Sequence, residues 1–281
     1  MRIFITGASG QLGQELQKIL LKEELFLADI DNCDITKSQQ VFTCVKNFKP
    51  EVIIHTAAYT DVDGCEANID LAFEVNALGT RNIILAANQV GAKVVYISTD
   101  FVFDGRKKTP YLEFDYPNPL SVYGQSKLAG EDYVKNLTDR YFILRTAWLY
   151  SPYGKNFVKT MLTLAEKQKE IKVVNDQVGT PTYAADLAQV IKKLIHTELY
   201  GLYHASGSGQ CSWYDFACEI FKIAGKKVKV VPITSKELNR PAKRPAYSVL
   251  RNFCLEEEGI FMPSWQESLK ENLNTIINKL K

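Results

Sequence analysis

Short apolar runs alternate with amphipathic stretches through the first half of the chain. Residues 2–6 are an apolar run, and the stretch after it carries Leu12, Leu16 and Leu20 on one face of a helix. The longest helical pattern covers 68–90. Strands and helices that alternate in this way are typical of an α/β fold with a doubly wound parallel sheet. The other apolar runs that predict strands are 25–29, 51–59, 93–100 and 141–148.

The alternation becomes less regular after Trp148, although no flexible linker interrupts the chain. Helices are expected at 155–169 and 184–196, and Ser212 and Asp215 have the spacing of a capping box that opens another helix. We therefore expect a second, smaller lobe. The expected division is a first domain of residues 1–151, a smaller carboxyl-terminal lobe of residues 152–281, and a segment 176–198 that packs back on the first domain.

Composition and charge exclude several classes of protein. The 281 residues are 46% hydrophobic, and 34 basic against 32 acidic residues leave a net charge of +2. This balance speaks against binding to nucleic acid or to a membrane surface. No apolar run approaches the roughly 18 residues of a membrane span, and the first one is too short for a signal peptide. Six cysteines without Cys-x-x-Cys spacing predict buried thiols and no metal site, so we expect a reduced, cytoplasmic protein.

A glycine-rich turn joins the first predicted strand to the first helix. Gly7, Gly10 and Gly13 have the spacing of a dinucleotide-binding turn, which needs a tight bend, close backbone approach to a pyrophosphate and close helix packing. The amino end of the helix would present its positive dipole to the phosphates. This predicts a Rossmann-type nucleotide site at the amino terminus of the chain.

Two carboxylates follow the second predicted strand. Asp29 ends that strand, where an acid accepts hydrogen bonds from an adenosine ribose, and no arginine follows it directly to pair with a 2′-phosphate. We therefore expect NADH to serve at least as well as NADPH, although Lys37 lies nearby in the sequence. Asp34 opens the next helix, either as a cap or beside the adenine.

The next two predicted strands end in small or polar residues. Ala57 and Ala58 leave space for a ligand in the crevice beyond the sheet, and Ser98, Thr99 and Asp100 supply hydroxyls and a carboxylate. These positions place polar chemistry beside the predicted nucleotide site.

Tyr123 and Lys127 lie four residues apart, on one face of a predicted helix. A phenol with a pKa of about 10 is a poor acid-base group at neutral pH unless a nearby cation favours its ionised form. Lys127 is such a cation. Alone, the spacing more often marks a solvated surface pair; the nucleotide site earlier in the chain favours a catalytic pair.

In order and spacing, the glycine turn, the strand ending in Ser98 and Thr99, and the Tyr123-x-x-x-Lys127 pair resemble the extended short-chain dehydrogenase/reductase superfamily. Further stretches resemble one of its families, the dTDP-4-dehydrorhamnose reductases, nearly from end to end. These stretches are 10–13, 57–63, 98–105, 145–150, 156–162, 174–182 and 244–250.

The resemblance implies reduction of the 4-keto group of dTDP-4-dehydro-L-rhamnose by NADH or NADPH, which yields dTDP-L-rhamnose. It implies Tyr123 as general acid, Lys127 as the group that lowers the phenol pKa and holds the nicotinamide ribose, and Thr99 as a donor to the carbonyl oxygen. The implied coenzyme contacts are Gly7, Gly10, Gln11, Leu12, Gly13, Asp29, Asp34, Ile35, Ala57, Ala58, Tyr59, Tyr123 and Lys127. The implied substrate contacts are Thr99, Asp100, Trp148, Asn156 and Arg244.

The chain departs from the family pattern in two respects. Phe101 stands where many relatives carry tyrosine, which removes one hydroxyl near the substrate. Some members are magnesium-bridged dimers; Glu15 matches one ligand position, Asp186 is a candidate for a second, and no third is found. Bound Mg²⁺ is therefore doubtful, and a monomer and a homodimer both stay open.

Two alternative functions stay open at this point. Another nucleotide-sugar reductase or epimerase of the superfamily would share the first domain and differ in the second lobe. A non-catalytic regulatory subunit similar to the methionine adenosyltransferase beta subunit would bind the coenzyme without turnover. The intact set of Thr99, Tyr123 and Lys127 favours an enzyme, because a scaffold does not need it.

Overall fold

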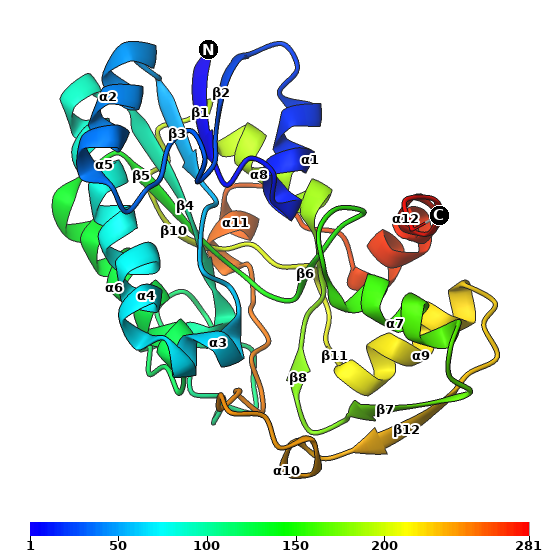
Figure 1. The fold of residues 1–281 in the computed structure, drawn as a ribbon. Coiled ribbons are helices and arrows are strands. Elements are labelled where there is room, and N and C mark those ends of the chain that lie inside the picture. Colours follow the sequence, from blue (N-terminus) through cyan, green and yellow to red (C-terminus); the bar gives the residue numbers. More distant parts are fainter. Residues whose placement is uncertain (281) are drawn as a thin grey trace.

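A six-stranded parallel sheet forms the centre of the larger of two lobes in the computed structural model, which describes residues 1–280 (Figure 1). The strand order is β10-β5-β4-β3-β1-β2, and all neighbours are parallel. This confirms the predicted α/β class. The strands are β1 (Arg2–Thr6), β2 (Glu24–Ala28), β3 (Val52–His55), β4 (Lys93–Thr99), β5 (Tyr141–Thr146) and β10 (Gly201–His204).

Helices cover both faces of this sheet (Figure 1). Ile3 and Ile5 of β1 pack with α1 and α8 on one face, whereas Phe4 packs with α2 and α5 on the other. Because both faces are buried, the strands are continuous apolar runs instead of alternating ones. The helices of the large lobe are α1 (Gln11–Ile19), α2 (Ser38–Phe48), α3 (Val62–Ala67), α4 (Ile69–Phe73), α5 (Thr80–Val90), α6 (Val122–Leu137), α8 (Ala184–Leu194) and α11 (Phe253–Glu257).

The long helix expected at 68–90 is interrupted. A π-helical segment, Glu74–Gly79, lies between α4 and α5 and carries the buried side chain of Asn76. That amide accepts a hydrogen bond from the backbone N–H of Tyr59 at 2.8 Å and donates to Ser126 Oγ at 3.0 Å. The widened turn therefore links the loop after β3 to helix α6, a tertiary contact that apolar periodicity does not reveal.

Within the described residues, the smaller lobe packs three of its four helices around a core rich in aromatic side chains. Phe216, Trp265 and Met161 lie at its centre, and the expected capping box of Ser212 and Asp215 opens its middle helix. Its helices are α7 (Phe157–Ala165), α9 (Trp213–Ile223), α10 (Ser235–Leu238) and α12 (Trp265–Asn278). Its paired strands are β7 (Glu170–Val174) with β12 (Lys229–Ile233), β8 (Val178–Gly179) with β11 (Cys211–Ser212), and β6 (Leu149–Tyr150) with β9 (Thr182–Tyr183).

The two lobes are not divided at one point of the chain. Helix α8, the longest element of the segment 176–198, packs against α1, whereas β8 and β9 of the same segment lie in the smaller lobe. Two further parts of the expected second lobe also join the first, which corrects the boundary set at 152–281. Strand β10 pairs with β5 at the edge of the large sheet, and Leu255 of α11 lies in the same core as β1. Strand β10 covers an edge of β5 that would otherwise be open.

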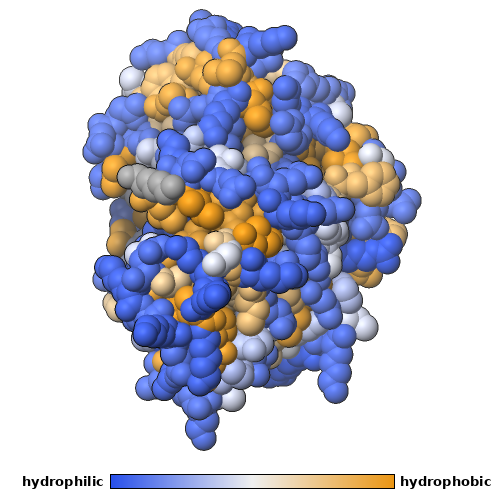
Figure 2. Space-filling view, turned by 90° about the vertical axis from the view of Figure 1, so that its right-hand side faces the viewer, coloured by the Kyte–Doolittle hydropathy of each residue, from blue (hydrophilic) through white to orange (hydrophobic). Residues whose placement is uncertain are grey.

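On the face shown in Figure 2, hydrophobic residues gather in patches between charged and polar ones. Within residues 1–280, no helix has both the length and the apolar character needed to cross a membrane.

Candidate active site

A cavity of about 1100 Å³ opens at the carboxyl ends of β1, β3 and β4 and extends to residues of the smaller lobe. The carboxyl ends of parallel strands are where α/β sheets bind ligands. Most of the predicted site residues line this one cavity. They are Gly7, Gly10, Gln11, Leu12, Asp29, Asp34, Ile35, Ala57, Ala58, Thr99, Asp100, Tyr123, Lys127, Trp148 and Arg244.

The glycine turn has the geometry of a phosphate cradle. Gly7 has φ +63°, and a Cβ placed on it would lie 2.8 Å from the backbone nitrogen of Ala57. Gly10 caps α1 without a side-chain hydrogen bond, so the amino end of the helix keeps free N–H donors beside the cavity. These residues fit the diphosphate of a nicotinamide dinucleotide.

Two carboxylates line the end of the cavity that follows β2. Asp29 Oδ2 accepts a hydrogen bond from the backbone N–H of Ser9 at 2.9 Å, which ties Asp29 to the glycine turn. Asp34 Oδ1 accepts from the N–H and the hydroxyl of Thr36, at 2.9 and 2.8 Å, so Asp34 braces its own turn and also lines the cavity. Lys37 lines the same cavity and adds a cation.

Three of the expected contacts do not line the cavity. Gly13 instead packs α1 onto β1, because a Cβ there would lie 2.4 Å from the carbonyl oxygen of Gly7. Tyr59 is held through its backbone by Asn76. Asn156, expected to touch the substrate, caps α7 and donates to Gln11 Oε1 at 2.9 Å. The packing role of Gly13 agrees with the spacing of the glycine turn, whereas the contacts of Tyr59 and Asn156 were expected from the resemblance.

Tyr123 stands at the start of α6, beside Thr99 at the end of β4. Burial raises the pKa of Tyr123 well above its ordinary value, although a hydrogen bond with Thr99 opposes this effect. The expectation that Lys127 favours the ionised phenol is therefore not met in this structure: burial keeps the phenol protonated at neutral pH. Phe101 packs edge-on against the Tyr123 ring, with 5.6 Å between centroids.

Lys127 lies one turn further along α6, and its side chain is almost fully buried. Within residues 1–280 its ammonium has no hydrogen-bond partner and lies 4.1 Å from the centroid of the Tyr96 ring, a cation–π distance. Burial lowers the pKa of Lys127 to about 7, and the charge of Glu131 opposes this. His55, behind it, is fixed between Thr6 and Thr80 at 2.7 and 3.0 Å.

Asp100 is buried at the edge of the cavity and is incompletely bonded. Its Oδ1 accepts from Thr99 Oγ1 at 3.1 Å, whereas Oδ2 has no partner among the described residues. Burial raises the pKa of this carboxyl to about 6. A buried acceptor without a partner is costly, so this oxygen is suited to a hydroxyl of a bound ligand.

Two tryptophans form a shelf where the lobes meet. Trp148 stacks on Trp213 with 3.5 Å between ring centroids and an interplanar angle of 8°. Trp148 holds a positive φ of 46°, a conformation that is strained for a bulky residue and common at ligand sites. Both rings line the cavity. Trp213 was not among the expected site residues; the sequence placed it only within the capping box that opens α9.

Arg244 reaches the cavity from the smaller lobe. Its guanidinium bonds Asp63 in a two-pronged ion pair, at 3.1 Å from Nη1 to Oδ1 and 2.9 Å from Nη2 to Oδ2. The charge expected to meet a substrate diphosphate is therefore already paired in part.

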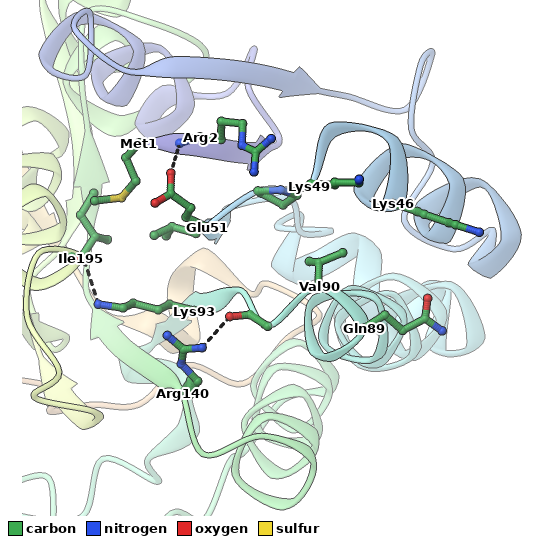
Figure 3. A pocket seen from close by; sticks show the side chains of 13 residues that line it. Met1, Arg2, Lys46, Lys49, Glu51, Gln89, Val90, Lys93, Arg140 and Ile195 are labelled. Carbon is green, nitrogen blue, oxygen red and sulfur yellow. Dashed lines mark hydrogen bonds between the residues drawn. The ribbon is translucent and has the colours of Figure 1, made fainter.

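A second cavity, of about 570 Å³, lies at the opposite end of the sheet (Figure 3). Two of its cations bond backbone carbonyls: Lys93 Nζ donates to the carbonyl of Thr197 at 2.7 Å, and Arg140 Nη1 donates to that of Gly91 at 2.7 Å. Glu51 accepts from the N–H of Arg2. These bonds tie strand starts to helix ends.

No group of three or more His, Cys, Asp or Glu side chains in residues 1–280 is placed to hold a metal ion. Glu15 is buried and pairs with Lys18 at 3.2 Å. Asp186 accepts from the hydroxyl of Ser268 at 2.6 Å, and burial raises its pKa. The two carboxylates considered for magnesium thus each have a protein partner.

Comparison with known proteins agrees with this geometry. The RmlD substrate binding domain family matches residues 1–278. A dTDP-4-dehydrorhamnose reductase from Aggregatibacter actinomycetemcomitans is 42% identical over 285 residues, covering 96% of this chain and 97% of that protein.

Two solved structures are similar over nearly their whole length. The dTDP-4-dehydrorhamnose reductase from Clostridium acetobutylicum is 51% identical, with a TM-score of 0.96 over 99% of this chain and 100% of that one. The enzyme from Bacillus anthracis, in complex with NADP, is 49% identical, with a TM-score of 0.93 over 96% and 97%. The family expected from the motifs is confirmed: this chain belongs to the dTDP-4-dehydrorhamnose reductases.

Proposed function

We propose that this chain reduces dTDP-4-dehydro-L-rhamnose to dTDP-L-rhamnose with NADH or NADPH, in the formation of an activated sugar. One observation carries the proposal. Thr99, Tyr123 and Lys127 line the same cavity as the glycine turn, in a chain that matches this family over residues 1–278. A regulatory subunit would not need a buried, protonated phenol beside a buried lysine.

The residues have separate tasks in this reaction. The reduced nicotinamide supplies a hydride to carbon-4 when it is bound. Tyr123, kept protonated by burial, donates its proton to the oxygen as the oxygen gains negative charge. Thr99 turns its hydroxyl from Asp100 to the same oxygen and stabilises that charge. The ammonium of Lys127, one helical turn after Tyr123 on α6, contributes a positive charge to the site.

Substrate orientation comes from both lobes in this proposal. The unpaired Oδ2 of Asp100 accepts a sugar hydroxyl, and the ring of Trp148 provides an apolar surface for the sugar. Arg244 lies on the side of the smaller lobe, where its outer N–H groups face the diphosphate while Asp63 keeps the guanidinium oriented.

Asp29 is expected to set the coenzyme preference. Its carboxylate is tied to Ser9, so it can turn away from a 2′-phosphate only by giving up that hydrogen bond. We therefore expect NADH to be at least as good as NADPH, with Lys37 limiting the difference. Steady-state kinetics with both coenzymes decide this. A kcat/KM for NADPH about tenfold or more above that for NADH, worth roughly 1.4 kcal/mol, would show that Asp29 does not discriminate.

Reductase activity is expected to survive removal of divalent ions. Mg²⁺ retains several waters and gains from additional anionic ligands, whereas Glu15 here offers one buried carboxylate already paired with Lys18. Activity measured after EDTA treatment, with and without added magnesium, tests this. Complete loss that magnesium restores would mean that ligands from elsewhere, including a second copy of the chain, complete a site.

The substrate is tested with a panel of 4-keto sugar nucleotides. Oxidation of NADH or NADPH is measured for dTDP-4-dehydro-L-rhamnose, for its C5 epimer and for a UDP-linked 4-keto sugar. The proposal expects the highest kcat/KM for the first. Preference for another sugar would favour a related reductase, and coenzyme binding without turnover on any of them would favour a regulatory subunit.

A further inference from the structure

A buried ionic network lies directly behind the catalytic pair. Glu131 follows Lys127 by one helical turn on α6, and its side chain is 0% exposed. Its Oε1 accepts from Arg145 Nε at 2.8 Å and from Ser98 Oγ at 2.6 Å. Its Oε2 accepts from Arg145 Nη2 at 2.7 Å and from Lys135 Nζ at 3.1 Å. Four donors hold this carboxylate in one position.

These contacts keep Glu131 ionised. Burial alone would neutralise a carboxyl, but the hydrogen bonds and charge of Arg145 outweigh burial and hold the pKa of Glu131 below its ordinary value. A simple structural role, joining α6 to β5, accounts for the ion pair with Arg145. It does not account for the effect of the Glu131 charge on the pKa of Lys127, which lies on the helix face toward the cavity.

The other groups around Lys127 offer it no negative charge. Strand β3 contributes His55, whose pKa burial lowers to about 3, so this ring is neutral. Strand β4 contributes Tyr96, whose pKa burial raises, so its ring is neutral and meets the ammonium face-on. Tyr123 on α6 is protonated, and Arg145 on β5 is a cation. Within residues 1–280, Glu131 is the anion that acts on Lys127.

We propose that Glu131 is a positioning residue for the reduction: its carboxylate, fixed by Arg145 and Ser98 one turn beyond Lys127, keeps the lysine charged in its buried place above Tyr96. Ser98 joins this carboxylate to the end of β4, immediately before Thr99. The network therefore connects the strand that carries the hydroxyl donor with the helix that carries the acid and the cation. The proposal deepens the proposed function and rests on it for the kinetic readout alone.

The test uses the charge state of Lys127. Acetic anhydride acylates only the neutral amine, so acetylation of Lys127 across a pH series, followed by mass spectrometry, reports its titration without coenzyme or substrate. The parent protein is expected to titrate near pH 7, with reactivity rising as pH rises. In Glu131→Gln the titration is expected to move down by about one pH unit or more, a roughly tenfold lower ratio of charged to neutral lysine at a given pH.

The pH dependence of kcat/KM is expected to shift in the same direction if the charged lysine supports turnover. Because the charged form is lost as pH rises, the upper limb of the kcat/KM profile should move to lower pH in Glu131→Gln. A structural defect would lower the rate at every pH and leave the limb in place. Glu131→Asp, which keeps the charge, should return the limb toward that of the parent.

Lys135→Gln is the matched control. It removes a half-exposed partner of the same carboxylate but leaves the negative charge, so the limb should stay in place or move upward. Should Glu131→Gln fail to fold because Arg145 is left unpaired, the carboxylate is tested in the Arg145→Gln background: Lys127 should titrate at lower pH in Glu131→Gln, Arg145→Gln than in Arg145→Gln, because the two proteins differ only in the negative charge. A Lys127 titration that does not move in the variant lacking the carboxylate overturns the proposal, as does an equal downward shift in Lys135→Gln. If the Lys127 titration shifts as expected but the parent protein shows no turnover, this inference stands and the proposed function is rejected.

Discussion

Tyr123→Phe is expected to lower kcat by on the order of 10²–10⁴, the usual contribution of a positioned acid-base group. The substitution keeps the ring and its edge-on contact with Phe101, and it removes only the proton that the oxygen receives. Coenzyme affinity should change little, because the glycine turn and Asp29 lie at the other end of the cavity. Single-turnover reduction beside fluorescence titration with NADH measures both quantities.

The control for this substitution is the neighbouring ring. Phe101→Leu disturbs the packing of Tyr123 but leaves its hydroxyl, so it should reduce the rate far less than Tyr123→Phe. A Tyr123→Phe protein within about threefold of the parent rate would remove the tyrosine from the mechanism, since a positioned acid contributes at least about a hundredfold.

Lys127→Met is expected to lower both the rate and the affinity for the coenzyme. Methionine matches the length of the buried stem and packs on Tyr96, but it supplies neither the charge nor a donor for the nicotinamide ribose. A lost hydrogen bond from a charged group costs about 1.5–3 kcal/mol, which corresponds to a roughly tenfold to hundredfold higher Kd for NADH. Equilibrium titration and single-turnover kinetics measure the two effects separately. Unchanged NADH affinity would show that Lys127 does not contact the coenzyme.

Local sequence patterns predicted those parts of the fold that are determined by residues close together in the chain. The glycine turn, the end of β4 and the amino end of α6 lie where strand and helix periodicity placed them, because each depends on residues close in the chain. Strand β10 was not predicted, because its formation depends on a distant part of the chain. It has four residues, and what makes it a strand is pairing with β5, about sixty residues earlier.

The electrostatics of the site depend on burial and on distant partners, which sequence spacing does not show. The spacing of Tyr123 and Lys127 predicted a phenol whose pKa the lysine lowers, whereas burial raises the pKa of Tyr123 and lowers that of Lys127 to about 7. Arg244 looked like a free cation because Asp63, its partner, lies 181 residues away. Trp213 was not predicted because its stacking partner, Trp148, lies 65 residues earlier in the chain.

The central claim is that this cavity directs hydride to carbon-4 of the sugar while Tyr123 protonates the oxygen. The most direct measurement is one turnover of the parent protein with dTDP-4-dehydro-L-rhamnose and NADH that carries deuterium at the transferable position, with the product identified by NMR. The account predicts dTDP-L-rhamnose with one deuterium at carbon-4. An unlabelled product, deuterium at another carbon, the opposite configuration at carbon-4, or NADH that binds and is never oxidised would each contradict it.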